Sequence, residues 1–293
     1  MFSAVLALVG AFVFGSADFL GGVAAKRLRS LVVTAVSALS GLATMLVIVA
    51  LTGPHWHASD IAWGAASGLV SIVAIVLLYA CLAIGPMSIL SPLAAVVSAI
   101  APMVWGLAVK GEALAPLGYA GLGIALVATV LVGFVPGEKV VRPSLRGLVM
   151  AIGSGLAIGA FMIIMSQTRG DSGVVPLVFN RGVNGILTTS FVLVSVAVAV
   201  RRGRPAVSAL AAGGPQIGAT PSGRADLEHA VEVPHPAPML ARAWWLAATC
   251  GVVDATANAI MLVAVRSGDL SIVSALTSMY PSGTILLAAL VLR

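Results

Sequence analysis

The chain has 293 residues, of which 60% are hydrophobic and 9% are charged, and its mean hydropathy is +1.10. These values exclude a water-soluble domain and predict an all-α polytopic membrane protein. The formal net charge of +6 does not indicate nucleic-acid binding, because the basic residues stand singly or in threes between apolar segments, where they determine membrane topology.

Nine apolar segments are long enough to cross the hydrocarbon core of a bilayer, which takes about 20 residues each. In chain order they run from Phe2 to Ala25, Leu31 to Leu51, Ile61 to Ile84, Met87 to Val109, Pro116 to Val135, Leu145 to Ser166, Val174 to Val200, Trp244 to Val265 and Leu270 to Leu292. The connection from Arg201 to Arg242 is rich in Pro, Gly, Ser and Ala. We expect it to be a flexible loop outside the membrane.

A repeated phrase organises these segments. GPMSILSPLA at Gly85 to Ala94 recurs as GDLSIVSALT at Gly268 to Thr277, at an offset of 183 residues. The same offset aligns further pairs, namely Gly68 with Gly251, Ser71 with Asp254, and Lys110 with Arg293. The offset predicts two repeats of five helices, residues 1–138 and 139–293, and an odd number of helices inverts the second repeat relative to the first.

The distribution of basic residues agrees with inversion. Basic groups follow the first segment in the first half and the seventh segment in the second half. The positive-inside rule places these loops in the cytoplasm and the N-terminus outside. Arg293 aligns with Lys110, which is followed by Glu112 and a fifth helix. The second repeat therefore lacks its last helix, and we expect either a truncated product or a protein that works with nine helices.

Two stretches carry a family resemblance. Tyr79 to Glu112, with its SILSPLA run and a Gly-Glu pair before the next helix, resembles the EamA-like branch of the drug/metabolite transporter superfamily, as does GSADFLGG at Gly15 to Gly22. The resemblance implies a ten-helix inverted-repeat carrier that exports amino acids, other metabolites or toxic compounds. The chain departs from this pattern because it ends before a tenth helix and because its charges place the N-terminus outside, whereas the family implies a cytoplasmic N-terminus.

Asp254 and Asn258 are the leading candidates for a substrate site. They lie one turn apart in an apolar segment, where an ionisable side chain is costly unless it faces protein or water. A carboxylate and an amide on one helix face can bind a substrate ammonium or exchange a proton with a coupling pathway. The alternative is a structural Asp held by a hydrogen bond between helices.

Further candidates are polar residues in or beside the apolar segments. Asp18 either contacts substrate or pairs with nearby basic residues, and Tyr79 either lines the cavity or belongs to the core or interface. We expect Arg181 to extend its side chain to the membrane interface more readily than to bind an anionic group. Glu112 is expected to cap the helix that follows it.

Prolines and glycines indicate how the helices pack and bend. Pro92, Pro102 and Pro281 each remove one backbone hydrogen bond and create either hinges for alternating access or static kinks. The GxxxG spacings Gly64 to Gly68 and Gly155 to Gly159 predict close helix packing.

The sequence thus predicts a proton-coupled secondary transporter that exports a small metabolite, amino acid or drug from a plasma membrane, specifically a bacterial inner membrane. We expect it to be no enzyme and to bind no metal or cofactor, since nucleotide-binding loops and metal-ligand clusters are missing from the sequence. Its partners are a small-molecule substrate, the bilayer and, through a face left open by the missing helix, a second copy. The alternatives are a membrane-embedded lipid-modifying enzyme and a truncated assembly partner that does not transport.

Overall fold

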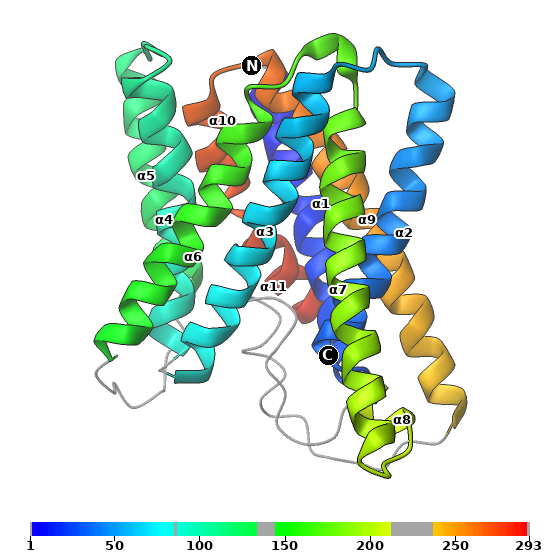
Figure 1. The fold of residues 1–293 in the computed structure, drawn as a ribbon. Coiled ribbons are helices and arrows are strands. Elements are labelled where there is room, and N and C mark those ends of the chain that lie inside the picture. The colour runs from blue at the N-terminus through cyan, green and yellow to red at the C-terminus, as the bar shows by residue number, and fades with distance from the viewer. Residues whose placement is uncertain (1, 85–86, 134–143, 212–236, 292–293) are drawn as a thin grey trace.

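The computed structural model describes residues 2–84, 87–133, 144–211 and 237–291. The regular elements of these residues are all helices (Figure 1). In chain order they are α1 (Phe2–Ala25), α2 (Ser30–Thr52), α3 (Ala58–Ile84), α4 (Met87–Ala108), α5 (Pro116–Gly133), α6 (Leu145–Met165), the 3-10 turn η1 (Gly170–Ser172), α7 (Val175–Arg201), α8 (Val207–Leu210), α9 (Ala237–Ser267), α10 (Leu270–Thr277) and α11 (Tyr280–Val291).

Within the described residues, seven helical segments are long and apolar enough to cross a membrane, and α10 with α11 counts as one of them. Many of the large side chains on their outer surfaces are exposed hydrophobics, such as Leu69 and Leu193, which suits contact with lipid tails. The protein is therefore an all-α, multi-pass membrane protein.

The expected helix boundaries are wrong in two places. The segment from Leu270 to Leu292 is divided, because α10 ends at Thr277 and α11 begins at Tyr280. The stretch expected to be a loop from Arg201 to Arg242 contains the short helix α8 and the first residues of α9. Residues 212–236 lie outside the described part of the chain.

Small residues allow the helices to pack closely, as the GxxxG spacings predict. A Cβ at Gly64 would collide with the backbone of Pro176 on α7, and a Cβ at Gly155 would lie 2.6 Å from the carbonyl oxygen of Ala94 on α4. Ser154 on α6 donates a hydrogen bond of 2.9 Å to the carbonyl of Ala74 on α3. Close backbone contact thus replaces large interlocking side chains over much of the core.

The two ends of the bundle differ in charge. The end that holds Phe2, here called the N-terminal end, lies opposite the end at which α1 finishes, here called the basic end (Figure 1). Described basic residues near the basic end are Lys26, Arg27, Arg29, Arg146, Arg201, Arg202, Arg204 and Arg242. The N-terminal end carries Lys110, Arg169 and Arg266 together with Asp60, Glu112, Asp171 and Asp269.

Candidate functional site

A polar face runs along α7 in the middle of the bundle. Asn180, Asn184 and Thr188 follow one another at intervals of one helical turn, which places them on one side of α7. All three are buried, with 4%, 7% and 6% of their surface exposed. Since a helix surrounded by lipid would be apolar on its outer side, this face must serve contacts within the protein.

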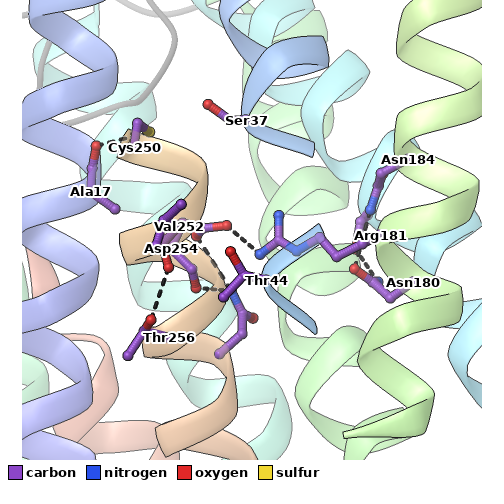
Figure 2. A network of polar contacts seen from close by, with 12 residues as sticks. Ala17, Ser37, Thr44, Asn180, Arg181, Asn184, Cys250, Val252, Asp254 and Thr256 are labelled. Carbon is purple, nitrogen blue, oxygen red and sulfur yellow. Dashed lines mark hydrogen bonds and ion pairs between the residues drawn. The ribbon is translucent and has the colours of Figure 1, made fainter. Parts of the chain in front are cut away.

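Arg181 directly follows Asn180 on α7, and its side chain extends to Asp254 on α9. Its guanidinium Nη2 donates a hydrogen bond to Asp254 Oδ2 and forms an ion pair (Figure 2). Only 13% of the Arg181 side chain and 24% of the Asp254 side chain are exposed. Arg181 was expected to extend to the membrane interface, and this expectation is wrong, because the opposite charge on Asp254 holds the guanidinium inside the bundle.

Asn258 lies on α9 one turn beyond Asp254 and bonds to it. Its Nδ2 donates to the Asp254 carbonyl at 2.8 Å and to Asp254 Oδ1 at 3.3 Å. Both oxygens of the carboxylate therefore accept a hydrogen bond, one from each helix. Arg181 Nε and Asn184 Oδ1, in contrast, are buried and have no hydrogen-bond partner in the part of the chain that the structure describes, so this region retains one donor and one acceptor for a further group.

Helix α2 lies between α7 and α9 and packs on both. Gly41 of α2 allows α9 to approach closely, because a Cβ there would stand 3.1 Å from the carbonyl oxygen of Gly251, and it would make ordinary contact with Arg181 Cδ at 3.6 Å. Ser37, one turn earlier on α2, donates a 2.9 Å hydrogen bond to the carbonyl of Ala247 on α9. The small residues of α2 bring α9 close enough for Arg181 to reach it.

Asn180 connects α7 to α3 in the other direction. Its Nδ2 donates to Ser67 Oγ at 2.9 Å and to Ser71 Oγ at 3.4 Å, and its Oδ1 accepts from Asn184 Nδ2 at 3.2 Å. Two adjacent residues of α7 thus hold different helices: Asn180 binds α3, whereas Arg181 binds α9. The sequence alone does not show the partners of either residue.

The structure brings two of the four predicted substrate-site residues together, Asp254 and Asn258. Asp18 lies on α1, which packs along α9, and its neighbour Ala17 accepts a 3.2 Å hydrogen bond from Cys250 Sγ, one turn before Asp254. The side chain of Tyr79 lies outside the described part of the structure. A substrate role for each of these four residues stays a prediction.

The three predicted hinge prolines differ in their surroundings. Pro281 follows the interruption between α10 and α11. Pro102 lies within α4, and its Cδ would be 2.9 Å from a Cβ placed at Gly159 on α6. The side chain of Pro92 lies outside the described part of the structure, although the backbone of α4 is helical there. The backbone is thus interrupted at Ser278 and Met279, just before Pro281, and is helical throughout α4.

A second polar group covers the N-terminal end. Arg266, at the end of α9, donates to the Gly173 carbonyl at 2.7 Å and to Thr168 Oγ1 at 2.7 Å. His57 Nε2 lies 2.8 Å from Asp171 Oδ2, and this hydrogen bond lowers the pKa of Asp171 below its ordinary value of 3.8. Sequence reasoning missed these contacts, because they join short connections that are distant in the chain.

Glu112 also belongs to this end, and its expected role was wrong. Its carboxylate accepts backbone hydrogen bonds from Leu270 at 2.8 Å and from Ser271 at 3.0 Å. It therefore caps α10, not α5, the helix that follows it in the chain.

Comparison with known proteins adds information on the fold alone. No protein-family model matches the chain, and no curated protein matches it. A protein known from a crystal structure is similar over 98% of this chain and 88% of its own, with a TM-score of 0.66 and 16% sequence identity. At this identity the similarity extends to the arrangement of helices and does not identify an activity.

Proposed function

We propose that the protein is a secondary transporter of the EamA-like type that exports a small metabolite, amino acid or drug across a plasma membrane by alternating access. One observation carries the proposal, the Arg181–Asp254 ion pair inside a bundle of apolar helices. Charged side chains at such a place are costly and are typical of substrate or ion pathways. Basic residues at the basic end favour a cytoplasmic location for that end.

Packing around two glycines supports the inverted repeat that this proposal assumes. Gly68 on α3 faces the Asn180 carbonyl and the Val183 side chain on α7. Gly251 on α9, its counterpart in the repeated sequence, faces Ser37 and Ser40 on α2, which have the same three-residue spacing. Helix α3 begins and α9 ends at the N-terminal end (Figure 1), so the two run in opposite directions.

The packing of whole helices shows the same correspondence between the two halves of the chain. Helices α3 and α4 pack on α6, and correspondingly α9 and the α10–α11 segment pack on α1. This correspondence favours nine membrane spans, with α4 and α5 included, and two inverted repeats. A substrate site near the middle of the membrane, between the repeats, is the usual arrangement in carriers of this design.

The ion pair suggests how substrate and protons are coupled. A substrate that bonds to the Arg181 guanidinium would compete with Asp254 for it. The released carboxylate then requires a new partner in a medium of low dielectric constant, and a proton is the smallest one available. We therefore propose that Asp254 carries the coupled proton and that Asn258 keeps the carboxylate oriented.

Transport by the purified protein in liposomes tests this function. Exchange of labelled amino acids and efflux of ethidium are measured with and without a pH gradient, for the wild type, Asp254→Ala and Arg181→Gln. We expect both substitutions to abolish flux. Thr256→Val is the matched control, because Thr256 is exposed on α9 and, among the described residues, its hydroxyl bonds only to the Val252 carbonyl of its own helix.

Two outcomes would contradict the proposal. Unchanged flux in Asp254→Ala would remove the ion pair from the transport pathway. Conversion of an added lipid or metabolite without any flux would instead indicate a membrane-embedded enzyme.

A further inference from the structure

Helices α3, α4 and α6 pack on one another and form one group, and α1, α9, α10 and α11 form a second group. Helices α2 and α7 connect the two groups, because α7 packs on α3 and α2, and α2 packs on α9, whereas α10 of the second group packs on α4 of the first. Helix α10 packs on α4, α1 and α5, whereas α11 packs chiefly on α1 (Figure 1). Ala275 of α10 is 1% exposed and belongs to one apolar cluster with Leu122 and Ala125 of α5. Helix α10 therefore forms the principal contact between the two groups at the N-terminal end.

The Glu112 carboxylate stabilises this contact by hydrogen bonds to α10. Glu112, in the connection between α4 and α5, accepts hydrogen bonds from the backbone N–H groups of Leu270 and Ser271 and from the Ser271 hydroxyl. A negative charge at a helix N-terminus also interacts favourably with the helix dipole. One residue of the first half of the chain thus satisfies the free donors of a helix in the second half.

Two glycines make this position possible for Glu112. Gly111 has φ of +68°, a left-handed conformation that turns the chain away from α4. Gly106, on the last turn of α4, lies beneath the carboxylate, since a Cβ there would be 2.5 Å from Glu112 Oε2. The Glu112 N–H donates to the Gly106 carbonyl at 3.1 Å. The side chain is therefore held against α4 while it bonds to α10.

The helix is interrupted between α10 and α11. Helix α10 ends at Thr277, and Pro281 follows the two residues of the interruption and α11's first residue. Proline has no N–H to donate to the Thr277 carbonyl, and Thr277 Oγ1 is buried with no hydrogen-bond partner among the described residues. The N–H groups of Ser278 and Met279 donate to Ser274 and Leu276 at 3.0 and 3.2 Å, so the helical hydrogen-bond pattern is interrupted only after Met279.

We propose that α10 is the gate at the N-terminal end of the transport pathway, that the segment from Ser278 to Pro281 is its hinge, and that Glu112 is the latch that holds it shut. This inference rests on the proposed function, because it assigns one closed end to the alternating-access cycle. With the basic end in the cytoplasm, the latch closes the outer side of the pathway.

Thiol labelling measures the gate without reference to transport. The reporter is Ala275→Cys, in the contact between α10 and α5, in a Cys250→Ala background. Cys81 is 0% exposed within a cluster formed by α3, α4 and α6, so it reports unfolding in the same molecule. Labelling of both cysteines by a maleimide reagent is followed by peptide mass spectrometry, on protein with and without Glu112→Ala.

We expect Glu112→Ala to speed the labelling of the reporter at least about tenfold, because several hydrogen bonds to a charged group are lost, while Cys81 labelling stays unchanged. Glu112→Gln keeps one acceptor oxygen and should give an intermediate rate. Gly106→Ala should also speed labelling, because its methyl group displaces the carboxylate. Asp269→Asn is the control, since it removes a charge at the same helix end where the Asp269 side chain makes no capping hydrogen bond.

The outcomes separate the latch from the proposed function. Unchanged reporter labelling in Glu112→Ala and Gly106→Ala would overturn the latch, even if the wild type transports. Equal acceleration of the reporter and Cys81 would also overturn it, because the protein would then be unfolding as a whole. Selective acceleration in a protein that shows no flux would support the latch and contradict the transporter.

Discussion

Removal of one partner of the Arg181–Asp254 pair should destabilise the folded protein strongly. In Asp254→Ala the guanidinium, with 13% of the Arg181 side chain exposed, would lose its charged partner. Breaking a buried ion pair in this way costs about 3–5 kcal/mol. Because the Asp254 side chain is 24% exposed, we expect a value near the lower end, about 3 kcal/mol, or roughly a hundredfold in the unfolding equilibrium.

The double variant Arg181→Met with Asp254→Leu should recover most of this loss. Hydrophobic replacement of both partners of a buried pair is often neutral or stabilising, so we expect the double variant to lie within about 1 kcal/mol of the wild type. Unfolding in mixed micelles, followed through tryptophan fluorescence, measures each free energy. Trp244 and Trp245 lie on α9, the helix that carries Asp254.

Two results would refute this reasoning. One is an Asp254→Ala variant whose free energy of unfolding is indistinguishable from that of the Thr256→Val control. The other is a double variant whose loss equals the sum of the two single losses, since additivity would mean that the two charges do not interact.

Two further predictions concern helix packing and the N-terminal end. Gly251→Ala should lower the free energy of unfolding by about 1–3 kcal/mol, because its Cβ would collide with α2. Gly182→Ala is the control, because a Cβ at Gly182 would lie in open space, and it should not destabilise the protein in the same unfolding measurement. Equal losses in the two variants would contradict the packing argument. The lowered pKa of Asp171 implies stabilisation that is present above the ordinary Asp pKa and is lost as the pH falls through the folded-state value. The melting temperature of Asp171→Asn should therefore lie below that of the wild type at pH 7, and the difference should vanish in acid; a difference independent of pH would show that the His57–Asp171 contact does not depend on the carboxylate charge.

The sequence predicted the helices well because a membrane span requires a long apolar segment, and that property is local. It also predicted that Asp254 and Asn258 share a helix face, since their spacing alone determines it. It did not predict Arg181 as the partner of Asp254, because that pairing depends on how closely Gly41 allows α2 and α9 to approach. The length of the Arg181 side chain and the preference of arginine for the membrane interface favoured a position at the membrane surface. The buried negative charge of Asp254 outweighed both and holds the guanidinium inside the bundle.

Glu112 shows a second limit of local reasoning. A carboxylate just before a helix usually interacts with that helix, so the sequence favoured α5. The left-handed turn at Gly111 instead directs the side chain toward α10, a helix more than 150 residues later in the chain. The interruption between α10 and α11 was equally difficult to predict, because the similar segment that forms α4 also contains prolines and is a continuous helix.

Asn180 and Arg181 are neighbours on α7 with side chains of different length, and this difference suggests which helices move together. Asn180 is short and bonds directly to Ser67 on α3 at 2.9 Å, so a small displacement between α3 and α7 would break this contact. Arg181 is long and flexible, and its ion pair with Asp254 can follow α9 over a larger distance. A displacement of α9 relative to α7 is therefore tolerated at Arg181 more readily than a displacement of α3 is at Asn180. In the transporter proposed above, alternating access would accordingly place its relative helix motion at the Arg181–Asp254 pair.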